Sequence, residues 1–341
     1  MSYVTKILAI NKDTFEETLL NSIAQDNLIK WMSRPNAQDP KYLLLLKDNR
    51  IIIIDKNGNI VLDKTVDYII DQGSINNNGM VAVKSGAELY VYDVEGNLVY
   101  HETYGSNIAG SPLIGTNYLW VKLEGGTQTV YIYDLSDFTY KTFQKGTAYN
   151  SLTLAINETG EIAFGGYWTL GPVGYLFKAF SDGSVVDAST TFGYAIYNIH
   201  TNPLGAGGLL RLSKGGPQYA YVLFNSNLET ATLKTGTETE DIDLVHDINL
   251  SVALFFNKAS ANVDRWSLNI ETLTGEHTGT LTLPHALDEI SRYKRMGDMT
   301  PDGKFAVIPS TEIFLIDVEN LIVAKTINKA FSNVPVRMIV S

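Results

Sequence analysis

Cysteine is absent from this chain of 341 residues, which excludes disulfide bridges, thiolate metal sites and cysteine nucleophiles. Long apolar runs are missing too, because no stretch approaches the length of a membrane span or of the core of a secretion signal. We therefore expect no signal peptide and no membrane span, and we expect a protein of the cytoplasm or of a virion.

Positive charge is also scarce. Only 18% of the residues are charged, and the formal net charge is −11. Because nucleic acid binds to basic surfaces, we expect no nucleic-acid partner.

The chain further lacks the short motifs that carry catalysis. It contains no GxSxG elbow, P-loop or GxGxxG turn, and its five histidines show no HxH or HExxH spacing. The sequence therefore predicts a protein that is not an enzyme and that needs no cofactor.

What the chain does have is a repeat. Eight times, a short β-branched or aromatic run turns and continues as a second apolar run, with spacings of 38 to 48 residues, and in seven of the eight copies the first run ends at an Asp or Asn. The short side chain at this position can accept a bond from a backbone N–H two residues on, which defines the turn after a strand. At the one exception, Phe180, we expect Asp182 to take over this role. The eight positions are Asn11, Asp55, Asp93, Asp134, Phe180, Asn225, Asn269 and Asp317.

A period of 40 to 50 residues with several short strands per repeat is typical of a β-propeller. We predict one all-β domain over residues 1–341, built of four-stranded antiparallel blades. Seven full repeats run from about residue 25 to 328, and a hairpin at 5–20 and a single strand at 335–341 are left over. We expect residues 1–24 and 329–341 to share a closing blade, since this would cover two exposed sheet edges. The count favours eight blades, with seven as the alternative.

The repeats LYVYDVEGNLV and IFLIDVENLIV resemble those of the WD40-like and YVTN-type propeller superfamily, and the resemblance covers nearly the whole chain. The Trp-Asp dipeptide and the Gly-His pair of true WD40 repeats are absent. The resemblance implies an architecture and a tendency toward binding, and it implies no reaction.

Two groups of residues are candidate sites. His200 and His246 fall on the expected innermost strands of adjacent repeats, with Asp247 beside the second, so they could share a metal ion in a central channel. Calcium, held by inward carboxylates and amides, is the alternative ion. The second group is Tyr167, Trp168 and Tyr175, which we expect on a long loop that could stack on a sugar or anchor a protein.

From these observations we expect a non-enzymatic structural or protein-interaction module within a larger assembly, such as a phage or virus particle. One alternative is a propeller that binds a glycan or a receptor through the Trp168 loop. The other is a metal-dependent hydrolase with its site in the central channel.

Overall fold

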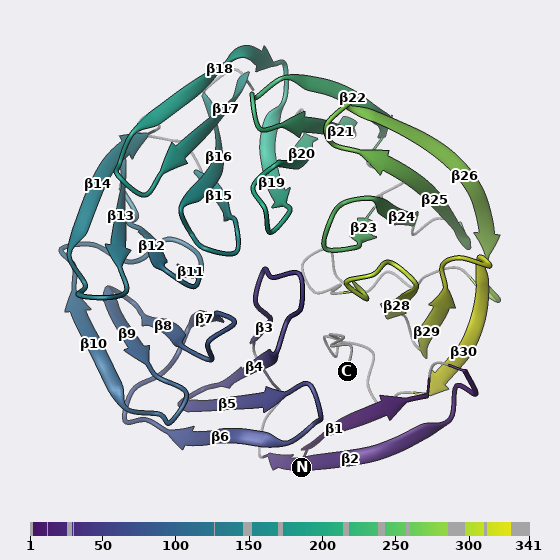
Figure 1. The fold of residues 1–341 in the computed structure, drawn as a ribbon, viewed down its shortest axis with the longest axis horizontal. Coiled ribbons are helices and arrows are strands. Elements are labelled where there is room, and N and C mark those ends of the chain that lie inside the picture. The colour runs from purple at the N-terminus through teal and green to yellow at the C-terminus, as the bar shows by residue number, and fades with distance from the viewer. Residues whose placement is uncertain are drawn as a thin grey trace.

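The structure is a computed structural model that describes residues 3–11, 13–25, 29, 31–125, 127–145, 152–169, 173–213, 218–237, 243–256, 260–285, 297–309 and 312–328. Over these residues the chain runs once around a ring of antiparallel sheets, with the first strand of each sheet nearest the axis and the fourth at the rim (Figure 1). The prediction of a single all-β propeller with four-stranded antiparallel blades is confirmed.

Seven four-stranded sheets form the blades. Blade 1 consists of β3 (Trp31–Ser33), β4 (Tyr42–Lys47), β5 (Arg50–Asp55) and β6 (Ile60–Thr65). Blade 2 consists of β7 (Gln72–Ile75), β8 (Val81–Ser85), β9 (Glu88–Tyr92) and β10 (Leu98–Thr103). Blade 3 consists of β11 (Leu113–Ile114), β12 (Tyr118–Lys122), β13 (Gln128–Asp134) and β14 (Tyr140–Lys145). Blades 4 and 5 are β15 (Thr153–Ile156), β16 (Ile162–Thr169), β17 (Val173–Phe180), β18 (Val185–Phe192); and β19 (Ala195–Thr201), β20 (Gly207–Ser213), β21 (Gln218–Asn225), β22 (Thr230–Thr237). Blades 6 and 7 are β23 (Asp243–His246), β24 (Val252–Phe256), β25 (Asn262–Asn269), β26 (Thr274–Thr282); and β27 (Asp298–Met299), β28 (Phe305–Pro309), β29 (Glu312–Asp317), β30 (Ile322–Asn328). Among the described residues, β1 (Tyr3–Ile10) and β2 (Glu17–Gln25) pair with each other and with no other strand.

The core lies between neighbouring blades. Six buried clusters join the middle strands of one blade to those of the next, as Ile51 and Ile53 of β5 do with Val81 and Val83 of β8. A seventh joins blade 1 to the N-terminal hairpin at Ile23. Both faces of a middle strand are therefore covered, which explains continuous apolar runs such as Ile51–Ile54. The outer strands are largely exposed, and β6 alternates between half-buried and exposed residues along its whole length.

The repeated Asp or Asn acts as predicted. Asp55 Oδ1 accepts bonds from the backbone N–H groups of Asn57 and Asn59 at 2.9 and 2.8 Å. At the exceptional repeat, Asp182 Oδ1 accepts the Ser184 N–H at 2.8 Å. Gly58 follows in the first of these turns with φ of +83°, a conformation that a residue with a Cβ adopts at a cost.

The hairpin β1–β2 stands in the ring between blades 7 and 1 (Figure 1). Leu20 of β2 packs on Gly58 of the blade 1 turn, just as Leu62 of β6 packs on Gly96 of the blade 2 turn. On the other side, Lys325 of β30 donates to the Phe15 carbonyl at 2.7 Å and pairs with Glu17 at 3.0 Å. The hairpin thus takes the place of the two outer strands of a further blade.

The described residues do not form eight four-stranded blades, which is the count that the sequence favoured. They form seven, plus this two-stranded sheet, because the sequence supplies only two strands before blade 1. The expected strand at 335–341 lies outside the described residues, so closure by both termini stays a prediction. Within the described part of the chain, no helix has the length and apolar character that a membrane crossing requires.

Candidate functional site

The wall of the central channel is built from the innermost strands and the turns that follow them. In five blades a buried Asn, Asp or Thr ends the inner strand and accepts backbone N–H bonds from its own turn. Examples are Asn76 with the Met80 N–H at 3.0 Å and Asn157 with the Ile162 N–H at 3.1 Å. The five residues are Asn76, Asn157, Asn202, Asp247 and Thr300.

Asp247, one of the candidate metal ligands, belongs to this series. Its carboxylate accepts the backbone N–H groups of Ser251 and Val252, both at 2.7 Å, and the Ser251 hydroxyl at 2.7 Å. The side chain is 1% exposed. The carboxylate is therefore occupied by its own turn. Four sister blades use an uncharged oxygen at this place, the amide oxygen of an Asn or the hydroxyl oxygen of Thr300.

The structure places the two candidate histidines in contact. His200 of β19 and His246 of β23 lie edge to face, with His200 Nδ1 and His246 Nε2 3.0 Å apart. His246 Nδ1 is 2.8 Å from the Asp247 carbonyl oxygen, which can only accept. His246 Nδ1 therefore carries the proton, and in a neutral ring Nε2 then accepts from His200 Nδ1.

The chain of bonds continues to Asn198. Its Oδ1 accepts the Ile199 N–H at 2.9 Å, which turns its amide nitrogen toward His200 Nε2 at 3.2 Å. All four ring nitrogens thus have a partner when both histidines are neutral. Burial, with a smaller contribution from His246, lowers the pKa of His200 to about 3, and burial lowers the pKa of His246 as well. The pair is uncharged at neutral pH.

No group of three or more His, Asp or Glu side chains suited to a metal ion occurs among the residues that the structure describes. The geometry brings His200 and His246 into contact but directs the Asp247 carboxylate to its own turn. A metal ion or calcium at these residues stays a prediction, and it would have to displace the hydrogen bonds just described.

A feature that the sequence did not reveal closes part of the channel. The loop at 34–41, which we call the plug, follows β3 and reaches the centre of the ring (Figure 1). Arg34 pairs with Asp298 of blade 7 at 2.9 Å, and the side chains are only 14% and 9% exposed. Asn36 donates to the Ile156 carbonyl of blade 4 at 2.7 Å, and Ala37 is fully buried. Blade 1 is thereby bound to blades 4 and 7 across the axis.

A signal for the plug was present in the sequence. The corresponding turn in blade 2 covers only residues 76–80, so the first turn is longer, and it holds Pro35 and Pro40. Its length indicated an unusual loop, but nothing in it indicated the partners, which lie 120 and more residues away.

No protein-family model matches the sequence, and no curated protein matches it either. Solved structures do match. A functionally unknown protein from Desulfotomaculum acetoxidans DSM 771 is 13% identical with a TM-score of 0.59, over 86% of this chain and 97% of that one. The RRP9 WD40 repeats are 12% identical with a TM-score of 0.55, over 84% and 88%. KlAtg21, in complex with the coiled coil of AgAtg16, is 11% identical with a TM-score of 0.58, over 86% and 95%.

The fold is a WD40-like β-propeller. At these identities the likeness concerns the fold alone, and the resemblance seen in the repeats is confirmed at that level.

The aromatic candidates of the propeller lie on strands and not on a loop. Tyr167 and Trp168 belong to β16 and Tyr175 to β17, because the two strands extend toward residues 170–172, which lie outside the described part. Tyr167 and Tyr175 are directly paired across the sheet and stack at 4.9 Å. All three side chains are half-buried, and a role in binding a glycan or a protein stays a prediction.

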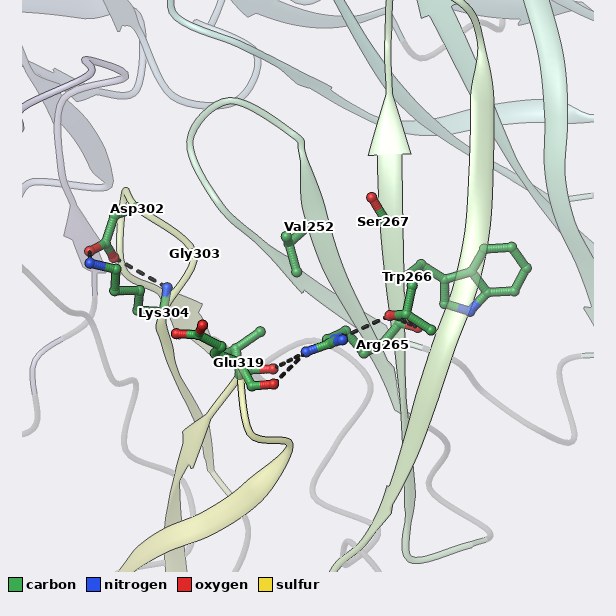
Figure 2. A pocket seen from close by; sticks show the side chains of 10 residues that line it. Val252, Arg265, Trp266, Ser267, Asp302, Gly303, Lys304 and Glu319 are labelled. Atoms are coloured by element: carbon green, nitrogen blue, oxygen red, sulfur yellow. Dashed lines mark hydrogen bonds and ion pairs between the residues drawn. The ribbon is translucent and has the colours of Figure 1, made fainter.

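A groove of about 450 Å³ separates blades 6 and 7 of the propeller (Figure 2). Arg265 crosses it and donates to the carbonyls of Val318 and Glu319 at 2.7 and 2.8 Å, and to the Thr278 hydroxyl at 2.8 Å. Lys304 lies 3.6 Å from Asp302 on the far wall. Arg265 therefore links the two blades across the groove, whereas Lys304 and Asp302 pair within one turn of blade 7.

Proposed function

We propose that this propeller is a non-enzymatic protein-interaction module that binds its partners at the rim. The observation that carries the proposal is a belt of exposed apolar side chains within the first two residues of the outer strand. Five blades contribute to the belt, through Val61, Leu98, Tyr140, Val186 and Ile322, each between 42% and 53% exposed. The belt runs along the start of one strand type from blade to blade, which sets it apart from single exposed apolar residues, which need no explanation.

The interior supports the same proposal. The polar side chains around the axis cap turns or bond to one another, and the plug connects blades across the channel. KlAtg21, one of the proteins with a similar fold, was itself solved in complex with the coiled coil of another protein, AgAtg16.

To test the proposal, the full chain is cross-linked to its neighbours in its native cell at natural abundance. The cross-linked peptides are then identified by mass spectrometry. We expect cross-links from rim residues to one recurrent partner, and loss of that partner when Val61 and Val186 are both changed to Asp. Melting of the variant should match the parent, since both residues are exposed. A chain that sediments as a monomer with no rim cross-links would overturn the proposal.

We extend the proposal to a large assembly such as a phage or virus particle, for which the cysteine-free composition rich in Asn, Thr, Tyr and Gly is the support. Sedimentation of the chain with intact particles is the expected result. Recovery of all of the protein in the soluble fraction, apart from any particle, would remove the extension.

We also propose that residues 335–341 complete the ring by pairing with β1. The support is the position of the hairpin, which supplies only the two outer strands of a further blade. Residues 329–334 separate the end of β30 from this segment, and 66–71 separate β6 from β7 in the same kind of connection. An inner strand at this place would cover the β1 edge, which faces no other strand among the described residues.

A further inference from the structure

The outer strand of each blade is an edge, and an edge strand offers unpaired backbone groups to other chains. In this propeller a shift in register interrupts the pairing of the third and fourth strands in six of the seven blades. The hairpin β1–β2 has a shift as well. Such bulges twist an edge away from new partners.

Blade 3 is the exception. β14 pairs with β13 without interruption over six residues, from Gln128 with Lys145 to Tyr133 with Tyr140. Its outer edge is therefore the one blade edge without this protection in the part of the chain that the structure describes.

The direction of the backbone groups along β14 follows from the turn before it. The Asp134 N–H bonds to the Thr139 carbonyl at 2.9 Å, so residues 134 and 139 form a hydrogen-bonded pair. Pairs alternate along an antiparallel ladder, so the next pair, Tyr133 with Tyr140, is not hydrogen-bonded. The N–H and C=O groups of Tyr140, Thr142 and Gln144 consequently point away from β13, toward the free edge.

The turn of the neighbouring blade comes near this edge at one point. Gly183 of the β17–β18 turn lies where an added Cβ would be 3.5 Å from the Thr142 carbonyl oxygen. Tyr140, Thr142 and Gln144 are nevertheless all exposed.

The chemistry of β14 selects the partner. Its sequence, YKTFQK, holds two lysines and no acid in a chain whose net charge is −11. Lys145 pairs with Asp187 at 2.6 Å, whereas Lys141 is exposed beside the free edge. Two copies of this strand would bring like charges together, which disfavours pairing between two copies of the propeller.

We propose that the outer edge of β14 binds an extended, acidic segment of a partner protein as an added β-strand. The added strand bonds to the backbone of Tyr140, Thr142 and Gln144, and its carboxylates lie opposite Lys141. Tyr140, which is 53% exposed, offers an apolar surface to one face of the segment. This inference rests on the proposed function, because it names the partner's chemistry and the place where it binds.

The test begins with a display library of ten-residue peptides, selected against the full chain, and continues with fluorescent synthetic copies of the selected peptides. We expect the selected peptides to alternate apolar and polar residues and to contain Asp or Glu. Thr142→Pro removes an outward N–H that the fold itself does not use, so this variant should fold. It should weaken binding roughly tenfold or more, the equivalent of about 1.4 kcal/mol for a lost bond and a steric block.

Charge variants provide the matched control. Lys141→Glu should weaken binding, and Lys56→Glu, which reverses an exposed charge on the turn of blade 1, should leave it unchanged. Hydrogen exchange gives the direct readout: the amides of 140, 142 and 144 exchange quickly in the free chain and become protected when the peptide binds.

Selection of no peptide, binding to the Thr142→Pro variant within twofold of the parent, or protection at other amides would each overturn the inference. The proposed function fails separately. If a natural partner remains bound to the Thr142→Pro variant, the protein is still an interaction module, but it binds through another part of the rim. If the chain has no partner at all, both the proposed function and this inference are wrong.

Discussion

His200 donates its Nδ1 proton to Nε2 of His246 across 3.0 Å, joining the inner strands of blades 5 and 6 beside the axis. The bond requires both rings to be neutral, and burial lowers the pKa of each. The pair therefore links the stability of the propeller to pH.

The first prediction concerns this linkage. A histidine whose pKa is lowered by folding binds its proton more readily in the unfolded chain, so stability is present above the unfolded pKa of about 6.5 and is lost as the pH falls below it. Each such histidine contributes a slope of up to about 1.4 kcal/mol per pH unit. Urea unfolding at pH 7.5, 6 and 5 should show a steep loss for the parent and a shallower one for His200→Gln. Parallel curves for the two proteins would contradict the neutral pair.

The second prediction separates a structural from a metal-binding role for Asp247. Asp247→Asn keeps an oxygen for the N–H groups of Ser251 and Val252, as Asn76 and Asn157 do in their blades. Asp247→Ala removes it and leaves buried donors without a partner, at a cost of about 1–3 kcal/mol. Chemical denaturation should find the Asn variant close to the parent and the Ala variant less stable. Elemental analysis that finds stoichiometric metal in the parent and none in the Asn variant would favour the metal site.

The third prediction concerns the plug. Arg34→Met removes the ion pair with the Asp298 carboxylate, which is only 9% exposed, and this should cost about 3–5 kcal/mol. Adding Asp298→Asn to Arg34→Met should recover much of this loss, since the buried negative charge is then removed as well. A double-mutant cycle measured by denaturation gives the coupling between the two residues. Additive effects would mean that the ion pair across the axis contributes nothing to stability.

The fourth prediction uses the run Ile51–Ile54, whose four side chains are at most 2% exposed. Ile52 packs toward the N-terminal hairpin and Ile53 toward blade 2. Asp at either position buries an unpaired charge and should cost several kcal/mol, on the order of 4 or more. Val61→Asp, on the exposed side of β6, is the control and should melt like the parent. Normal melting of either isoleucine variant would contradict the packing of blade 1 on that side.

The fifth prediction tests ring closure. Deletion of residues 335–341 should expose the β1 edge, and the melting temperature should fall by roughly 2–4 °C for each kcal/mol lost. Hydrogen exchange should rise in β1 and β2 while the distant blade 3 serves as an internal control. Unchanged exchange in the hairpin would show that the C-terminal segment does not pair with it.

The repeats alone determined much of this protein. The Asp and Asn positions, the turn at Asp182 and the double-sided burial of Ile51–Ile54 follow from rules that act over a few residues or over one strand. Because each blade packs on its neighbours in sequence, the ring was predictable from these local units. The sequence also placed His200 and His246 on the inner strands of adjacent repeats, but it left open whether their side chains meet.

The tertiary structure alone decided the rest. The Asp247 carboxylate could face the channel or its own turn, and the packing of blade 6 sets it against Ser251 and Val252. Trp168 lies on a strand because pairing with β17 overrides the loop suggested by nearby glycines. The plug brings Arg34 to a blade 265 residues away, where it bonds to the Met299 carbonyl. Contacts across the axis depend on where the closed ring places distant turns, and no local pattern records that placement.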